Sequence, residues 1–350
     1  MTIREPALAP GAADRYPPAM KKIETTSDWE DRLVECPRER PVCLRASDVL
    51  DSVGHTPLLR LRHASEETGC EIFAKAEFMN PGGSIKDRIA KFIVESAEER
   101  GDLKPGMTIL EVTSGNTGIA LSLVGAARGY PVVIVMPKSA SEERRHMVRS
   151  LGARLELLDS LLHIQDAVRE TRERAAKDPS LFLPDQFANA DNALCHETTT
   201  GREILHQMEG RFDAFVMGVG TGGTVMGVCR AIRRAGHPAK VFALEPDESA
   251  VMSGSAPGCH GIQGLADGFI PDLMKVAEVD GVVRVRTADA KDMAARLGRE
   301  EGLLVGISAG ANVLGAVEIA RRLGKGHTVV TMLCDRGERY LSLAGAGAGS

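Results

Sequence analysis

The sequence predicts an α/β protein with mostly parallel sheets covered by helices. Short apolar, β-branched runs alternate with helical patterns along most of the 350 residues, which is the rhythm of βαβ units. The runs occur at 108–111, 132–136, 154–158, 214–218, 241–244 and 328–333. The helical patterns occur at 119–127, 142–150, 163–177, 203–208, 225–234, 288–297 and 309–323. Because such sheets bind ligands beyond the carboxyl ends of their strands, the turns that follow strands are the candidate sites.

The composition argues against several classes of function. The formal net charge is −5 with no basic block, and there is one Trp and three Tyr, so we expect no nucleic acid partner. No apolar run reaches membrane-spanning length and no signal core precedes the first motif, which favours a cytoplasmic protein without membrane contact. The seven cysteines are scattered and lack a C-x-x-C pair, as is typical of reduced thiols. We expect no metal site.

The length fits one large or two medium α/β domains. We expect two that meet at a cleft containing Lys86. We place the first domain at 47–187 and the second at 188–345, with the chain ends crossing between them. A proline-rich extension at 1–46 and a tail at 346–350 are expected to be weakly ordered.

Lys86 is the first candidate catalytic residue. An apolar run at 72–79 breaks at residues 80–83 (NPGG), a strong turn signal, and a helical pattern follows at once. Lys86 therefore falls in the first turn of a helix, where the macrodipole and burial both lower the pKa of a lysine. A neutral lysine can form a Schiff base with an aldehyde. The alternative is a surface lysine that begins an amphipathic helix.

Residues 113–118 (TSGNTG) form a second candidate site, directly after the run at 108–111. Backbone N–H groups at a helix N-terminus bind anions, and Ser and Thr hydroxyls add donors. Because the segment contains no Lys or Arg, a carboxylate suits it as well as a phosphate. The alternative is a helix cap that binds nothing.

Residues 218–224 (GVGTGGT) form a third candidate site after another strand. They contain G-x-G-x-x-G, and an acidic residue ends the next strand, so a nicotinamide enzyme is one hypothesis. Thr221 and Thr224 favour a terminal phosphate instead, since a pyrophosphate turn mainly needs bare backbone. A single phosphate on a cofactor captured by Lys86 gives all three segments a role.

These motifs resemble those of the fold type II pyridoxal 5′-phosphate (PLP) enzymes, which have the tryptophan synthase β-like fold. The similarity covers residues 52–342 and lies in the group of cysteine synthase and cystathionine β-synthase. Within it, residues 196–201 (HETTTG) and 334–337 (CDRG) are closest to the B-type cysteine synthases (O-acetylserine sulfhydrylase B). The other matching motifs are 54–58 (GHTPL), 80–88 (NPGGSIKDR), 113–118, 186–187, 220–224, 306–310 and 335–340.

The resemblance implies a PLP cofactor and a role for each motif. Lys86 binds PLP as a Schiff base and later moves the α-proton of the substrate. Asn116 hydrogen-bonds the 3′-oxygen of the ring, and Ser308 meets the pyridine nitrogen. The cofactor phosphate is held by Gly220, Thr221, Gly222, Gly223 and Thr224. The substrate carboxylate is bound by Thr113, Ser114, Thr117 and Gln186.

The resemblance also implies a reaction, β-replacement that forms L-cysteine from O-acetyl-L-serine and sulfide through an α-aminoacrylate. A serine at the pyridine nitrogen leaves the ring a weaker electron sink than a carboxylate would, which favours prompt loss of the β-substituent. The expected partners are a small amino acid and sulfide or a thiol, in a homodimer.

Three positions depart from the family pattern. Val112 stands in place of a proline, and residues 159–163 replace a glycine-bearing loop. Asp267 stands where the A-type enzymes have a small apolar residue, near the mouth of the site. It is either a solvated loop acid or a second catalytic residue that orients or deprotonates water or a thiol.

Three functions therefore stay open. The first is a cysteine synthase. The second is a cysteine β-lyase (desulfhydrase) that releases sulfide, or a cystathionine β-synthase-like enzyme that joins serine to a thiol. The third is a non-catalytic module of the same fold that acts through a partner, and the intact Lys86 argues against it.

Overall fold

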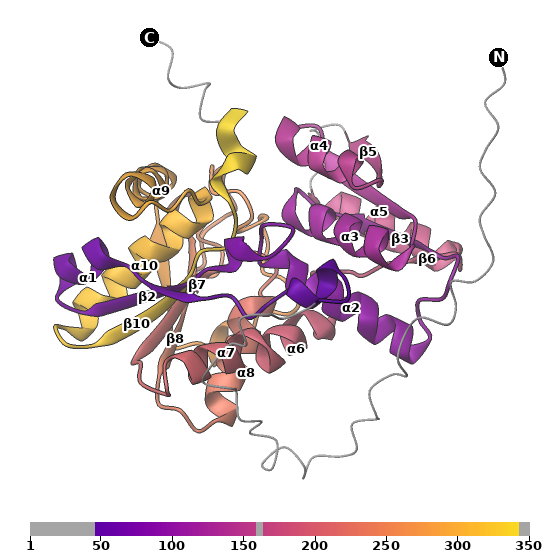
Figure 1. Ribbon diagram of the computed structural model, residues 1–350. Helices are drawn as coiled ribbons and strands as arrows, with labels where there is room; N and C mark the ends of the chain where they lie inside the picture. The colour runs from indigo at the N-terminus through magenta and orange to yellow at the C-terminus, as the bar shows by residue number, and fades with distance from the viewer. Residues whose placement is uncertain (1–45, 159–163, 343–350) are drawn as a thin grey trace. The chain divides into compact units, whose positions relative to one another are not determined.

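The computed structural model describes residues 46–158 and 164–342. Within these ranges the chain forms one compact unit built on two sheets (Figure 1). The extension expected at 1–46 lies almost wholly outside the described residues, as do the tail at 346–350 and the departure at 159–163.

The larger sheet has six strands in the order β1-β2-β10-β7-β8-β9. Only the pairing of β1 with β2 is antiparallel. The four-stranded sheet has the order β5-β4-β3-β6 and is parallel throughout. The strands of the larger sheet are β1 (Leu58–Arg60), β2 (Glu71–Lys75), β7 (Ala214–Gly218), β8 (Lys240–Pro246), β9 (Gly281–Val285) and β10 (Thr328–Met332). Those of the smaller sheet are β3 (Thr108–Val112), β4 (Val132–Pro137), β5 (Arg154–Leu158) and β6 (Leu181–Phe182).

Helices connect these strands and cover both faces of the larger sheet. They are α1 (Arg62–Thr68), α2 (Lys86–Arg100), α3 (Asn116–Arg128), α4 (Glu142–Ser150), α5 (Ile164–Lys177), α6 (Ala190–Thr198), α7 (Thr200–Gln207), α8 (Gly223–Arg234), α9 (Thr287–Glu301) and α10 (Ile307–Leu323). Helices α2 and α3 end at glycines in the left-handed region, Gly101 at φ 75° and Gly129 at φ 79°, a conformation that L side chains rarely adopt.

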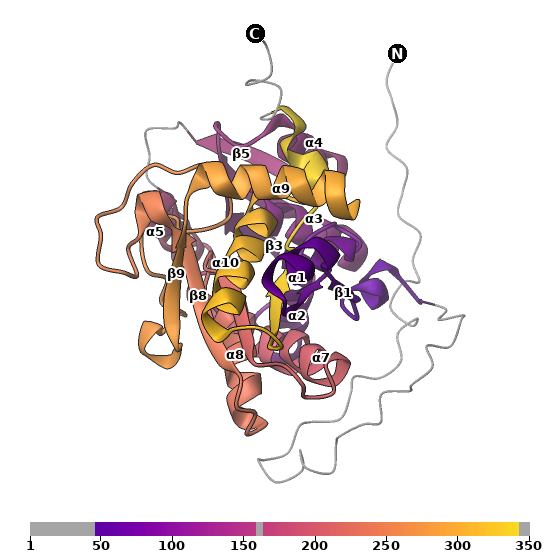
Figure 2. The same ribbon diagram turned by 90° about the vertical axis from the view of Figure 1, so that its left-hand side faces the viewer.

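Strand β7 is apolar on both faces because each face packs in a different hydrophobic core. Val216 packs in the core beneath α1, α9 and α10, the side onto which Figure 2 looks. Its neighbours Phe215 and Met217 pack in the core beneath α8 on the opposite face. Successive side chains of a strand point to opposite faces, so a central parallel strand with helices on both sides is apolar throughout.

Helix α2 passes between the two sheets and contacts both α3 and α6. A buried ion-pair network fixes its first turn. The Arg88 guanidinium pairs with Glu77 at 2.7 Å and with Glu203 at 2.7 Å, and Glu203 also accepts from Lys75 Nζ at 2.6 Å. Because burying such charges is tolerable only when each is paired, the network ties α2 to β2 and α7 two residues beyond Lys86.

The α/β class and the parallel sheets predicted from the sequence are confirmed. Strands lie at all six predicted positions, and α2 begins at Lys86 as predicted. The prediction missed β1, β6, β9, α1 and α6, and it gave the residues of β2 only as part of an apolar run. The domain boundary at 187/188 stays a prediction. The strand order shows that the larger sheet also contains strands from before this boundary. Strands β1 and β2 pair with the larger sheet, although they precede the smaller one in the chain.

Candidate active site

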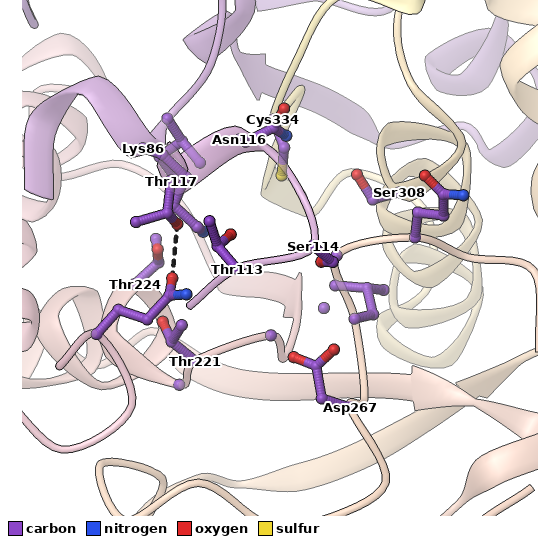
Figure 3. Close-up of a pocket in the computed structure, with 18 of the residues that line it drawn as sticks. Lys86, Thr113, Ser114, Asn116, Thr117, Thr221, Thr224, Asp267, Ser308 and Cys334 are labelled. Carbon is purple, nitrogen blue, oxygen red and sulfur yellow. Dashed lines mark hydrogen bonds between the residues drawn. The ribbon is translucent and has the colours of Figure 1, made fainter. Parts of the chain in front are cut away.

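A cavity that is partly open to solvent lies where the carboxyl ends of β3 and β7 face α2. Twelve of the thirteen predicted site residues line it, and Gly223 lies beside it as the first residue of α8. Figure 3 draws 18 of the residues that line the cavity, ten of them labelled. The lining members are Lys86, Thr113, Ser114, Asn116, Thr117, Gln186, Gly220, Thr221, Gly222, Thr224, Asp267 and Ser308.

Lys86 lies at the N-terminus of α2, and the residue before the helix provides no side-chain cap. Burial lowers the pKa of its ammonium group, and the carboxyl groups of Asp335 and Asp267 oppose that shift only in part. The direction agrees with the expectation for a lysine at the positive end of a helix. Lys86 is therefore an amine whose neutral, nucleophilic form is favoured.

The turn at 113–117 places hydroxyl groups at the start of α3. The Thr117 hydroxyl donates to Gln186 Oε1 at 2.6 Å, and Gln186 Nε2 donates to the Val112 carbonyl at 3.3 Å. The Thr113 hydroxyl accepts from the Gly115 amide at 3.1 Å. The four predicted carboxylate-binding residues are thus brought together at one edge of the cavity.

A buried carboxyl group, Glu111 at the end of β3, stands behind this turn. It accepts hydrogen bonds from the amides of Val112 (3.0 Å) and Gln186 (3.3 Å). Burial raises the pKa of Glu111 to about 8, because the loss of hydration outweighs the two backbone hydrogen bonds. The sequence pattern predicts Glu111 only as part of an apolar strand.

The glycine-rich loop after β7 forms an anion cradle at the start of α8. Within the described residues, the backbone amides of Gly220, Thr221 and Gly222 donate no hydrogen bond. Gly222 has φ 82°, which turns the chain so that these groups face the cavity. A Cβ at Gly220 would lie 2.4 Å from the Gly264 carbonyl, so no side chain fits there. Free amides at a helix N-terminus suit a phosphate.

Two threonine hydroxyls complete the cradle. Thr221 Oγ1 accepts from Asn192 Nδ2 at 3.0 Å, and Thr224 Oγ1 lies 3.1 Å from His196 Nε2. Burial lowers the pKa of His196 to about 3, so its ring is neutral and adds no charge. The donor set of amides and hydroxyls therefore fits the phosphate of PLP, with the Lys86 amine in the same cavity.

The side chain of Asn116 is held between Asp335 and Arg339, for which the sequence predicts no role. Its Nδ2 donates to Asp335 Oδ2 at 2.7 Å, and its Oδ1 accepts from the Arg339 guanidinium. The Tyr340 hydroxyl donates to the same Asp335 oxygen at 2.6 Å. Asp335, Arg339 and Tyr340 belong to the motif at 335–340. The sequence identifies that motif, but it does not indicate which residues these side chains contact. Ser308 lies nearby, buried at the start of α10.

Asp267 lines the cavity from the segment between β8 and β9. Burial raises its pKa to about 6, and His260 and Lys86 partly offset that shift. Its carboxyl group belongs to the half-buried lining of the cavity. Its catalytic role stays a prediction.

No group of three His, Cys, Asp or Glu residues in the described ranges could hold a metal ion. No helix among the same residues is long and apolar enough to cross a membrane.

The cavity brings together a lysine of lowered pKa, a loop with free backbone amides and a turn of hydroxyl groups, an arrangement that suits a PLP-dependent enzyme of α/β fold. Comparison with known proteins agrees. The family model "Pyridoxal-phosphate dependent enzyme" matches residues 49–335, and the chain belongs to that family. Its cofactor is pyridoxal 5′-phosphate.

Relatives of known activity are similar over most of their length. A cysteine synthase of Staphylococcus aureus (strain Mu50 / ATCC 700699) is 44% identical over 296 residues, covering 84% of this chain and 95% of that protein. The solved O-ureido-L-serine synthase is 42% identical with a TM-score of 0.83, covering 88% of this chain and 98% of that one. A hydrogen sulfide-producing enzyme, solved with an α-aminoacrylate intermediate, is 41% identical with a TM-score of 0.78, covering 83% and 89%.

Proposed function

We propose that this protein forms L-cysteine from O-acetyl-L-serine and sulfide by PLP-dependent β-replacement. The observation that carries the proposal is the cavity in which Lys86 lies together with the glycine-rich loop after β7 and the hydroxyl-bearing turn at 113–117. The similarity to a cysteine synthase over most of both chains supports the choice of substrates.

The cofactor supplies an aldehyde for Lys86 and a ring that withdraws electrons from the substrate α-carbon. Lys86, whose pKa is lowered by burial, takes the α-proton with its Nζ. Thr113, Ser114, Thr117 and Gln186 bind the substrate carboxylate and so fix the direction of the Cα–H bond. Asn116, clamped between Asp335 and Arg339, orients the cofactor ring at its 3′-oxygen.

Ser308 is proposed to meet the pyridine nitrogen with a neutral hydroxyl group. Because it carries no charge, the ring withdraws electrons less strongly than it would beside a carboxylate. Loss of the β-acetoxy group is then faster than reprotonation at another carbon, which favours replacement over transamination.

The test is a two-step mixing experiment on the holoenzyme. O-acetyl-L-serine is added first, and released acetate is measured against enzyme concentration. Sulfide, homocysteine or buffer is added second, and the amino acid product is identified. We expect one acetate per site and L-cysteine on addition of sulfide. Absence of acetate release would show that O-acetylserine is not the substrate.

A second function, release of sulfide from L-cysteine, is favoured by one observation. Asp267 lines the cavity as a carboxyl group with a pKa raised to about 6, and a carboxylate there repels hydrosulfide while it can deprotonate a neutral thiol or water. By deprotonating a thiol, the Asp267 carboxylate could also serve the condensation of serine with that thiol. Sulfide production from cysteine that exceeds cysteine formation would select this alternative.

We further propose that the protein acts in the cytoplasm as a homodimer, with small amino acids and sulfide as its partners. The proposal is supported by the absence of a membrane-spanning helix in the described ranges and by similarity to the family. Light scattering of the holoenzyme tests it, and a monomer at all concentrations would contradict the dimer.

A further inference from the structure

Arg144, on α4, lies against the turn proposed to bind the substrate carboxylate, although that turn contains no cation of its own. The side chain is 2% exposed and lines the same cavity. Its Nη1 lies 3.5 Å from the Ser114 carbonyl. A Cβ at Gly115 would lie 2.6 Å from Arg144 Nε, so the guanidinium packs directly on the backbone of the turn.

The partners of this guanidinium are neutral. Nη1 donates to Gln263 Oε1 and Nη2 to the Tyr340 hydroxyl at 2.8 Å, and the group also stacks 4.8 Å from the centre of the Tyr340 ring. Buried Nε has no hydrogen-bond partner. No carboxylate of the described residues forms an ion pair with Arg144, and Asp335 is reached only through the Tyr340 hydroxyl.

A buried cation without a counter-ion is costly unless a charge of opposite sign arrives. We propose that Arg144 supplies the positive charge for the α-carboxylate of the amino acid substrate. It acts through the backbone of the 113–117 turn and is a positioning residue, not one that touches the substrate. The inference rests on the proposed function, since it concerns the carboxylate that this turn is proposed to bind.

The same contacts connect the substrate to the cofactor side of the cavity. Arg144 donates to Tyr340, Tyr340 donates to Asp335, and Asp335 accepts from Asn116. Binding of a carboxylate beside Arg144 therefore acts on the same hydrogen-bonded chain that orients Asn116. A substrate without the carboxylate lacks this effect.

The test compares binding of L-alanine, which has no β-leaving group, with that of L-alaninamide, in which the carboxylate is neutral. Both are titrated into the holoenzyme by calorimetry. We expect the wild type to bind alanine more tightly by at least about tenfold. Arg144→Met should lose that preference while its affinity for the amide stays the same, and Arg144→Lys should keep most of it. Arg149→Gln is the matched control, because it removes an exposed cation from the same helix.

The outcomes distinguish failure of the role of Arg144 from failure of the proposed function. A wild-type preference retained in Arg144→Met overturns the role of Arg144 as counter-charge. Equal weakening of alanine and alaninamide also overturns it, since Arg144 would then only shape the turn. A wild type that binds neither ligand contradicts the proposed function itself. Should Arg144→Met lose the absorption of the bound cofactor, Arg144→Gln gives the same comparison with more of the hydrogen bonds retained.

Discussion

The Thr117 hydroxyl donates a 2.6 Å hydrogen bond to Gln186 Oε1, and this bond joins the start of α3 to the segment that follows β6. Both side chains are at least nine-tenths buried. The two ends of the proposed carboxylate site, 69 residues apart in the sequence, are therefore fixed relative to each other before a substrate enters. Such preorganisation lowers the entropy cost of binding.

Thr117→Val should weaken substrate binding, because it leaves Gln186 Oε1 buried without a donor. The loss of such a bond costs about 1–3 kcal/mol, so we expect KM for the amino acid substrate to rise roughly tenfold or more, with a smaller change in kcat. Thr117→Ser keeps the hydroxyl and is the control. Steady-state kinetics with both variants measure the effect, and an unchanged KM in Thr117→Val would contradict it.

Lys86→Ala should abolish turnover and the visible absorption band of the covalently bound cofactor, since the only amine that we assign to the cavity is removed. Arg100→Ala, at the exposed end of the same helix, serves as the control and should retain both. Absorption spectroscopy with added PLP gives the readout. A Lys86→Ala enzyme that keeps the band would move the assignment to another lysine.

Thr221→Val should leave the covalent bond possible but weaken retention of the cofactor. One hydroxyl of the cradle is lost, and a hydrogen bond to a charged acceptor contributes about 1.5–3 kcal/mol. Dialysis followed by measurement of bound PLP should show a Kd raised at least roughly tenfold. The conservative Thr221→Ser should bind as the wild type does.

Stability should fall as the pH rises toward 8, in part because of Glu111. Its pKa is raised to about 8 in the folded protein, against about 4.3 in an unfolded chain. The folded state therefore holds a proton that the unfolded state has released between these values. The contribution is complete below about pH 4 and is lost as the pH rises to 8, with a slope of up to about 1.4 kcal/mol per pH unit.

Glu111→Gln removes this titration and should flatten the pH dependence of the free energy of unfolding. The amide keeps an acceptor for one of the two backbone donors at Val112 and Gln186. Chemical denaturation of wild type and variant at pH 5, 6.5 and 8 measures the difference. If both lose the same stability over this range, another group is responsible, and Asp87, with a pKa raised to about 7, is the next to replace.

Asp267→Asn separates the two proposed reactions. For the synthase, removal of the carboxylate should raise kcat/KM for sulfide several-fold, since like charges no longer oppose each other. For the lyase, the same change should remove sulfide release, whose wild-type rate would rise with pH through about 6 as Asp267 ionises. Both activities are measured on one preparation between pH 5 and 8. A variant unchanged in both would show that Asp267 is a solvated loop acid.

The strands best predicted from the sequence are those buried on both faces. Phe215 and Val216 pack in different cores, so β7 has a continuous apolar run. The two-residue β6 is too short to give such a signal. Local sequence patterns also do not show which strands pair. Nothing in residues 71–75 indicates that they lie beside β10.

The site residues also fall into those that local sequence patterns predict and those that depend on tertiary contacts. Lys86, the hydroxyl turn and the glycine cradle were predicted because each combines a turn signal with the start of a helix. Arg144 and Asp335 were assigned no role, since their partners are set by tertiary packing. Arg144 reads locally as one cation among several on an amphipathic helix, and only its place against Gly115 distinguishes it.

The strand order has a consequence for synthesis of the protein. Strand β10 lies between β2 and β7 in the larger sheet, yet it is the last strand of the described chain to leave the ribosome. Until it emerges, β2 and β7 each present an unpaired edge, and such edges favour association with other chains. Nascent chains that end before Thr328 should therefore aggregate or be held by chaperones, whereas release of the final strand closes the sheet and brings Cys334 and Asp335 to the cavity.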